Sequence, residues 1–391
     1  MLSGGGARGA YEVGVLRYVR ERLPRSPFHA ITGSSVGAIN GSYIAATCDR
    51  PRAQIRMLVR MWKEISLDEM YRFGWDQMRS LPQVLFGKNL PKMTHGSTVG
   101  GLVDSRYIES IVREHVPWKG ISDNLYHGRL GAFACSATEL VTGITTVFVQ
   151  SRTQPQNWPS SPGQVIVPTA VTAAHALASA AIPILFPAVR VGDQLFVDGS
   201  LRQNTPIRPA MHLGADRLLV IGLRHHSSSY DAQREARERA RVVYPNAVFM
   251  LGKMLNALML DKLEADLARI HRTNEVLEAG IRAYGPSFAE VLARDVPGRE
   301  GRPYKKIDVV LIQPSQDLGQ VAWEVIRRSR LRKHTGVMAR WLRRTLDTTE
   351  DLTESDLASY VLFDPDFVTA LMDLGYADAQ AQHDELAALF E

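Results

Sequence analysis

A serine that could act as a nucleophile stands in residues 33–37, which read GSSVG. Ser35 is the central residue, and Gly33 and Gly37 lie two positions away on either side. Many hydrolases mount a nucleophilic serine in such a G-x-S-x-G sequence, because the glycines relieve the crowding of a sharp turn that exposes the hydroxyl. The pattern also arises by chance, so Ser35 needs a suitable structural context and a base.

The elements around Ser35 provide the context that this turn requires. The short apolar run of residues 29–32 predicts a strand, and residues 36–46 predict a helix. A strand, a tight turn and a helix in this order form a nucleophile elbow, with the serine at the helix N-terminus. The neighbouring Ser34 points elsewhere in that geometry, and we assign it no role.

The base that would take the proton of Ser35 has two kinds of candidate. In a Ser–acid–His arrangement the histidine follows the acid on a loop after a late strand, and His225 and His226 fit that position loosely. Asp198 is a stronger candidate, because it ends the alternating strand in FVDGS, at the edge where α/β proteins bind ligands. An aspartate in this place can also simply cap the following turn. The residues alone leave these alternatives open.

A glycine-rich turn, GGGARG, lies near the start of the chain and comprises Gly4, Gly5, Gly6, Ala7, Arg8 and Gly9. Its spacing fits G-x-G-x-x-G, but residues 22–32 lack the acidic residue that a dinucleotide-binding turn needs about 20 positions later. The turn can instead direct backbone N–H groups to one point at a helix N-terminus and form an oxyanion hole, with residues 5–8 as donors. It can also be a tight turn without a ligand.

Strand and helix patterns alternate over most of the chain, which indicates an α/β layer fold. The predicted strands lie at residues 129–140, 145–150, 194–198, 216–223 and 306–314, and the last two suit buried parallel strands. Helical spacing predicts long helices at residues 244–280 and 320–346. Only Met1 and Leu2 precede the glycine turn, so a first core strand would be very short; a displaced start or a shortened chain would explain this.

The composition is that of an ordinary globular protein, with 391 residues, 45% hydrophobic and 22% charged. Its two cysteines, Cys48 and Cys135, form neither a disulfide framework nor a zinc site, so we expect reduced thiols and no metal. No signal peptide is visible, and the apolar stretch 171–189 reads as a buried helix followed by a strand. We therefore expect a cytoplasmic protein.

The net charge of +5 conceals an asymmetry between the body and the tail of the chain. Residues 345–391 hold twelve of the 41 acidic residues and no Lys or Arg, so residues 1–344 carry 46 basic against 29 acidic side chains. A basic body favours an anionic partner, and residues 325–344 could lie as an interfacial helix on an anionic membrane or pack as an ordinary core helix. We find no nucleic-acid-binding signature.

Several sequence blocks together resemble the bacterial branch of the patatin-like phospholipases. The specific ones are GGGARGAYEVGVL, GSSVG, and ASAAIPILFPAV with FVDGSLRQNTP, in the order and spacing of that family. Weaker resemblance continues in NAVFMLGKMLNALMLDKLEADLARI and in SYVLFDPDFVTALMDLGYADA, so that nearly the whole chain is covered. The resemblance implies a three-layer α/β/α fold with a mostly parallel central sheet. We divide the chain into an acyl hydrolase domain, residues 1–318, and a helical extension, residues 319–391, made of a basic helix and an acidic helical tail.

The resemblance also implies the roles of the site residues. Ser35 would be the nucleophile and Asp198 the base, without a histidine; Gly33 and Gly37 would shape the elbow, and Gly4–Gly9 the oxyanion hole. Gly199 and Ser200 form the turn after the base, and Ser200 stands where the family usually has Gly or Ala. The implied function is hydrolysis of fatty-acyl esters, of phospholipase A or lysophospholipase type, without a cofactor. The alternatives are a catalytically silent lipid-binding or regulatory protein, an acyltransferase or esterase acting on another ester, and a dinucleotide-dependent enzyme.

Overall fold

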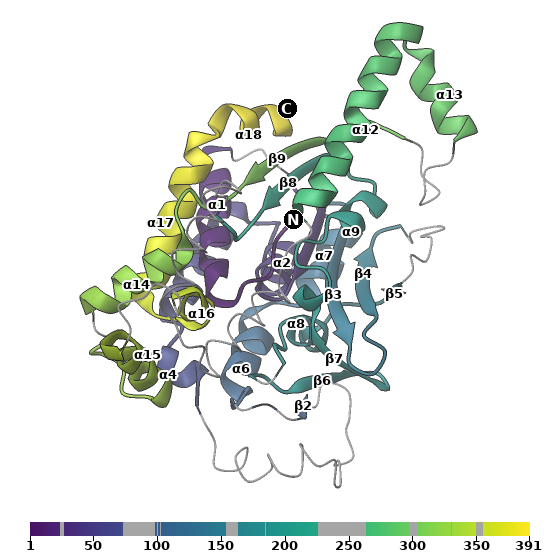
Figure 1. Ribbon diagram of the computed structural model, residues 1–391. Coiled ribbons are helices and arrows are strands. Elements are labelled where there is room, and N and C mark those ends of the chain that lie inside the picture. Colours follow the sequence, from purple (N-terminus) through teal and green to yellow (C-terminus); the bar gives the residue numbers. More distant parts are fainter. Residues whose placement is uncertain are drawn as a thin grey trace.

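The computed structural model describes most of the chain (Figure 1). The described residues are 1–23, 27–72, 98–99, 101, 103–153, 163–183, 185–225, 263–296, 304–329, 331–348 and 355–391. His226, one of the two candidate histidines, lies outside them. Of the helix predicted at residues 244–280, only the part from Leu263 onward is described, within α12 (Leu263–Tyr284).

In the part of the chain that the structure describes, seven strands form the larger sheet. Along the sheet they run β2 (Thr98–Val99), β6 (Ala188–Val191), β7 (Gln194–Asp198), β3 (Ala132–Glu139), β4 (Thr145–Ser151) and β5 (Gln164–Pro168), with β1 (Ala30–Ser34) also paired to β3. A smaller sheet pairs β8 (Arg217–Ile221) with β9 (Asp308–Ile312) in parallel. The strands predicted from apolar runs are therefore present.

Leu2 joins the two sheets. It forms parallel bridges to Gly33 in β1 on one side and to Ile221 in β8 on the other. The Leu2 N–H donates to the carbonyl of Thr32 at 2.9 Å. The short first segment therefore acts as a strand, and it leads directly into the glycine turn.

The sheet is more mixed than the predicted, mostly parallel one. β1–β3, β4–β5 and β8–β9 are parallel, whereas β3–β4, β3–β7, β6–β7 and β2–β6 are antiparallel. The antiparallel pairs include β3–β4 and β6–β7, which are joined by short connections that cannot hold a crossover helix. The parallel pairing of β8 with β9 confirms the prediction for residues 216–223 and 306–314. The strands β1 and β3, which lead to the candidate site, are also parallel.

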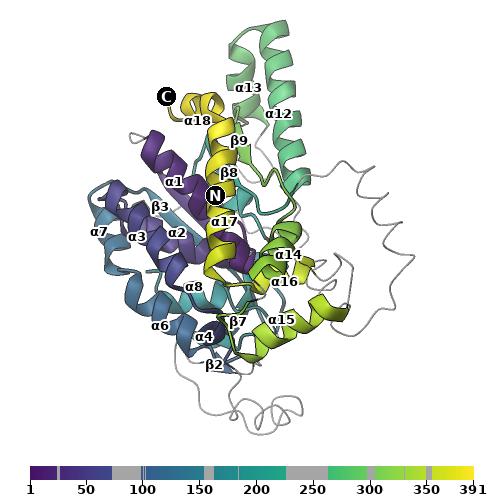
Figure 2. The same ribbon diagram turned by 90° about the vertical axis from the view of Figure 1, so that its left-hand side faces the viewer.

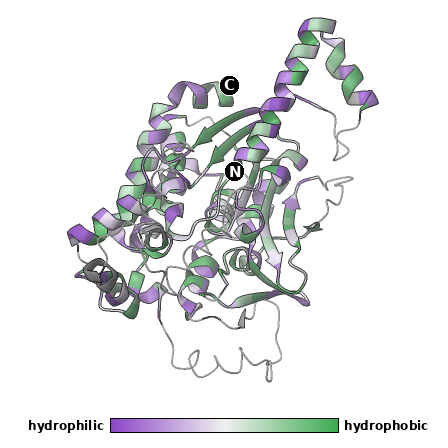
Figure 3. Cartoon of the chain, viewed as in Figure 1, coloured by the Kyte–Doolittle hydropathy of each residue, from purple (hydrophilic) through white to green (hydrophobic). Residues whose placement is uncertain are grey.

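Among the described residues, the strands separate the main hydrophobic core from two smaller ones, in keeping with the predicted three layers. In β8, Leu219 and Ile221 belong to the main core, while Leu218 and Val220 belong to a second core with α9 (Ile207–His212) and α12. This alternation follows from the two-residue period of a strand. Both strands of the small sheet are hydrophobic after a charged first residue (Figure 3).

The helices surround the sheet on both faces. The remaining ones before the tail are η1 (Gly6–Arg8), α1 (Gly9–Arg22), α2 (Val36–Ala46), α3 (Pro51–Glu64), α4 (Leu67–Met70), α6 (Arg106–His115), α7 (Lys119–Tyr126), α8 (Ala173–Ser179), η2 (Gly199–Leu201) and α13 (Ser287–Asp295). The C-terminal ones are α14 (Leu318–Ser329), α15 (Val337–Thr348), α16 (Ser355–Val361), α17 (Pro365–Ala381) and α18 (His383–Phe390). No helix within the described ranges is long and apolar enough to span a bilayer.

The C-terminal helices pack against the first part of the chain, and α17 runs alongside α1 (Figures 1 and 2). Two glycines allow close approach of these helices. A Cβ on Gly14 would lie 2.0 Å from the carbonyl oxygen of Met372, and one on Gly375 would lie 2.2 Å from that of Tyr11. The division at residue 318 stays a prediction.

The prediction of one basic helix over residues 320–346 is wrong, because α14 and α15 are separated. Leu331 has a φ of 47°, which a helix interior does not allow. The N–H groups of Thr335 and Gly336 then donate to the carboxylate of Asp68, at 2.9 and 3.1 Å. A side chain from α4 thus holds the segment between the two helices.

Candidate active site

The turn between β1 and α2 has the geometry of a nucleophile elbow. Ser35 is its single residue and adopts a φ of 51° and a ψ of −127°, a region that non-glycine residues rarely occupy. A Cβ on Gly33 would lie 2.3 Å from the carbonyl oxygen of Gly37, and one on Gly37 would lie 2.5 Å from that of Leu2. The two flanking glycines are therefore required by the close approach of the backbone.

The hydroxyl of Ser35 donates a hydrogen bond to the Oδ2 atom of Asp198 at 2.6 Å. Asp198 is the last residue of β7, whose pairing with β3 carries it to the end of β1. Both side chains are buried, with exposed fractions of 2% for Ser35 and 0% for Asp198. The structure thus brings together the two residues that the sequence singled out separately.

The other carboxylate oxygen of Asp198 is held by Ser200. Oδ1 accepts from the Ser200 N–H at 2.8 Å and from the Ser200 hydroxyl at 2.5 Å. Burial raises the pKa of Asp198 to about 6, and the hydrogen bonds from Ser200 and Ser35 oppose that rise. Asp198 is therefore a stronger base than an exposed aspartate, whose pKa is about 3.9, and it is still ionised near neutral pH.

Ser179 holds the backbone of the elbow, a contact that the sequence reasoning missed. Its hydroxyl accepts from the N–H of Ser35 at 2.9 Å and donates to the carbonyl of Ser136 at 2.6 Å. The residue ends α8 and is fully buried. Its only signal in the sequence was its place in the block ASAAIPILFPAV.

The glycine turn lies directly beside the side chains of Ser35 and Ser200. A Cβ on Gly4 would lie 3.0 Å from the Cβ of Ser35 and 2.7 Å from that of Ser200. The turn then passes into η1 and α1, so the positive end of the helix dipole faces this region. These contacts place the start of the turn, at Gly4, beside Ser35.

Some backbone N–H groups of the glycine turn donate a hydrogen bond and are therefore engaged, whereas others among them are unengaged. The N–H of Gly4 donates to the carbonyl of Asn204 at 3.2 Å, and that of Arg8 donates to the carbonyl of Gly5 at 3.1 Å. The N–H of Gly9 donates within the turn. Among the described residues, no acceptor binds the N–H groups of residues 5–7. Of the four predicted donors, these three are unengaged.

Glu12 is a second residue whose role was not predicted from the sequence. Its buried carboxylate binds groups next to the glycine turn. Its Oε1 accepts from the N–H of Ser3 at 2.7 Å, and its Oε2 accepts from the side-chain amide of Asn40 at 2.9 Å. The indole N–H of Trp62 in turn donates to Asn40 at 2.9 Å. Burial raises the pKa of Glu12 to about 8. This buried network ties the start of the turn to α2 and α3.

The histidine alternative finds no support in the geometry of the described residues. The partners of the Ser35 and Asp198 side chains in this part of the chain are each other and Ser200. His225 instead pairs with the carbonyl of Pro314 at 2.9 Å. Within the described ranges, no cluster of three or more His, Cys, Asp or Glu side chains could hold a metal ion.

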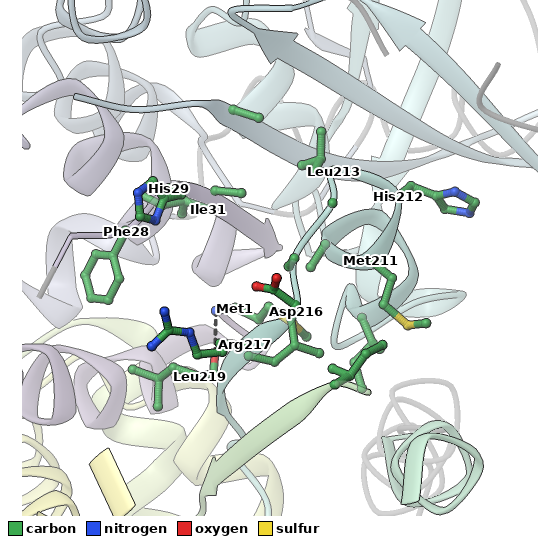
Figure 4. A pocket seen from close by; sticks show the side chains of 18 of the residues that line it. Met1, Phe28, His29, Ile31, Met211, His212, Leu213, Asp216, Arg217 and Leu219 are labelled. Atoms are coloured by element: carbon green, nitrogen blue, oxygen red, sulfur yellow. Dashed lines mark hydrogen bonds between the residues drawn. The ribbon is translucent and has the colours of Figure 1, made fainter. Parts of the chain in front are cut away.

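A small apolar cavity of about 70 Å³ opens next to Ser35. A larger cavity, of about 1280 Å³, lies elsewhere, between β1 and β8. Figure 4 shows Met1, His29, Asp216 and Arg217 around the larger cavity, with the Met1 amine bonded to the carbonyl of Leu219 at 2.7 Å. Neither Ser35 nor Asp198 lines the larger cavity, whereas Ser35 lines the smaller one.

Comparisons with known proteins give a family match and a similar solved structure. The family model described as patatin-like phospholipase matches residues 1–211, more than half of the chain. Among solved structures, the chain is similar to VipD from Legionella pneumophila, with 14% sequence identity and a TM-score of 0.30. That match covers 95% of this chain and 66% of VipD, so the chain spans just under two thirds of that protein's length. No curated protein matches the chain.

Proposed function

Since the chain belongs to the patatin-like phospholipase family, we propose that it is a lipid acyl hydrolase with Ser35 as nucleophile and Asp198 as general base. The observation that carries this proposal is the 2.6 Å hydrogen bond between the two side chains. The strained backbone of Ser35 and the three unengaged N–H groups of the glycine turn support it. Together these features serve acyl transfer, which needs a nucleophile, a base and an oxyanion hole.

In the first half of the reaction, the Ser35 oxygen attacks the ester carbonyl while Asp198 takes the hydroxyl proton. The negative charge that develops on the carbonyl oxygen is stabilised by the N–H groups of residues 5–7 and by the helix dipole behind them. The bond from the acyl carbon to the alcohol oxygen then breaks, and Asp198 returns the proton to the leaving alcohol. An acyl-enzyme on Ser35 remains.

In the second half, water attacks the acyl-enzyme and Asp198 accepts a proton from that water. The bond between the acyl carbon and the Ser35 oxygen then breaks, and the fatty acid leaves. Asp198 returns its proton to the Ser35 oxygen, which restores both side chains. The raised pKa of Asp198 supports this role, because a base with a pKa near the working pH transfers protons more effectively than an exposed aspartate. No histidine takes part.

The acid limb of the pH profile provides a test of the Asp198 role. Because Asp198 must be ionised, kcat/KM should fall below about pH 6, the pKa of that carboxyl. Ser200→Ala removes a hydroxyl that stabilises the ionised form, so we expect the limb to move to higher pH. Ser34→Ala is the matched control, since the buried Ser34 hydroxyl has no hydrogen-bond partner among the described residues. An unshifted limb in the Ser200 variant would argue against Asp198 as the base.

The lining of the small cavity supports an acyl substrate. Apart from Ser35 and Asn40, the side chains around it are apolar or aromatic and come from helices such as α3 and α6. An aliphatic chain gains about 0.8 kcal/mol for each methylene that it buries in such surroundings. We therefore propose that the acyl group of the ester enters this cavity.

The basic side chains of residues 325–344 support peripheral membrane contact. Its side chains Arg327, Arg328, Arg332, Lys333 and Arg340 are exposed. Val337, at the start of α15, is also 49% exposed. Exposed basic side chains beside an apolar residue suit the surface of an anionic bilayer.

Release of fatty acid from a panel of phospholipids, lysophospholipids and short-chain esters tests the function and its finer type. We expect release by the wild type that Ser35→Ala abolishes, and greater phospholipid hydrolysis when anionic lipid is included. Ester formation with an added alcohol would indicate an acyltransferase. A folded wild type that binds vesicles without any release would instead support the silent lipid-binding alternative.

A further inference from the structure

Helix α16 and the residues after it contact the glycine turn, although they lie far outside the family-matched residues 1–211. The hydroxyl of Ser359 accepts a hydrogen bond from the Nε of Arg8 at 2.8 Å. The guanidinium of Arg8 lies 3.9 Å from the centre of the Tyr360 ring, within the range of a cation–π contact. Two consecutive residues of α16 therefore hold one side chain of the turn.

The backbone of α16 also touches the turn directly. A Cβ on Gly6 would lie 2.3 Å from the carbonyl oxygen of Tyr360, and Gly6 has a φ of +56°. Gly6 therefore allows both the conformation of the turn and the close approach of α16. The position of α16 relative to Ser35 is thus fixed by backbone contact as well as by side chains.

The same segment lines the cavity beside Ser35. Tyr360 and Phe363 are the cavity residues that come from the C-terminal part of the described chain. The ring of Phe363 stacks on Trp62, with centroids 6.1 Å apart, and lies 6.3 Å from Tyr71. Phe363 therefore packs against two aromatic rings from the first part of the chain and forms one wall of the cavity with them.

The cavity beside Ser35 is small. Its volume is about 70 Å³, roughly half that of an apolar cavity of about 150 Å³ that binds a benzene molecule. It therefore accommodates only a few carbon atoms of an acyl chain, and a longer chain must displace part of the wall. The wall residues decide how unfavourable that displacement is.

We propose that the C-terminal segment from α16 to Phe363 determines the acyl-chain selectivity of the enzyme, with Phe363 as the principal selectivity residue. This inference rests on the proposed acyl hydrolase function. Phe363 does not take part in bond making; it limits the length of acyl chain that fits beside Ser35. The contacts of Ser359 and Tyr360 with the turn keep this wall in place.

The test compares wild type with Phe363→Ala and Phe363→Leu on 4-nitrophenyl esters from butanoyl to palmitoyl. We expect kcat/KM for the longer esters, relative to butanoyl, to rise by about fourfold for each additional methylene that the enlarged cavity buries. Phe363→Leu should shift the chain-length profile of kcat/KM in the same direction, but by less. This variant provides the test if Phe363→Ala does not fold. Thermal unfolding and the butanoyl rate report on the fold.

Phe367→Ala is the matched control. Phe367 is fully buried in α17 and does not line the cavity, so its variant should lose stability but retain the wild-type chain-length profile. Wild-type profiles in both Phe363 variants, with hydrolysis intact, would overturn the selectivity role and leave the proposed function standing. Absence of Ser35-dependent hydrolysis in the wild type would instead refute the function and the selectivity role with it.

Discussion

Asp198→Asn is expected to lower kcat by about 100- to 10,000-fold, the usual contribution of a positioned general base. The amide has the shape of the carboxylate and can still accept the hydrogen bonds from Ser200, so the fold should persist. It cannot take the proton of Ser35. Steady-state kinetics on a short-chain ester, together with a thermal unfolding curve, would measure both effects.

The control for this variant is Asp378→Asn, which changes another buried aspartate. Asp378 accepts hydrogen bonds from the Tyr11 hydroxyl and the Ser315 N–H. Neither of these residues belongs to the nucleophile elbow around Ser35. We expect that variant to lose stability with little change in kcat. Full activity of Asp198→Asn, with activity abolished by His225→Ala, would show that the base has been assigned wrongly.

Gly6→Ala is expected to lower kcat by about 100- to 1000-fold, the effect of losing an oxyanion-hole donor. The new Cβ would lie 2.3 Å from the carbonyl oxygen of Tyr360, which must displace either α16 or the N–H groups of the turn. The residue would also be held at a φ of +56°. Because the donors move relative to Ser35, the loss should appear in kcat for esters of every chain length.

Gly192→Ala separates backbone strain from displacement of the turn. Gly192 has a similar φ of +60°, but nothing lies within 4 Å of a Cβ at this position. An alanine there should cost roughly 1–2 kcal/mol of stability from the left-handed conformation, without changing kcat. Equal kcat in Gly6→Ala and wild type would exclude the turn as the oxyanion hole.

The elements around the site could be predicted from the sequence because their signals are local. The apolar run before GSSVG and the helix after it specify the elbow, and the turn residues that follow Asp198 mark the end of its strand. The register between β1, β3 and β7 then determines that Ser35 meets Asp198. That meeting could be expected only from the resemblance to a family.

The supporting residues could not be predicted, because their roles depend on contacts between distant segments. Ser179 binds the backbone of Ser35, 144 residues away in the sequence. Ser359 binds Arg8 across 351 residues. Nothing in the local sequence of either serine distinguishes it from one that simply faces its own helix. The break between α14 and α15 was missed for the same reason, since Asp68 holds it from another part of the chain.

Covalent labelling of the protein with a fluorophosphonate, followed by mass spectrometry of its peptides, tests the central claim most directly. The reagent reacts with activated serine nucleophiles and does not require knowledge of the natural ester. We expect one adduct on Ser35, absent from Ser35→Ala and formed much more slowly in Asp198→Asn. Labelling on another residue, or undiminished labelling of Ser35→Ala, would contradict it.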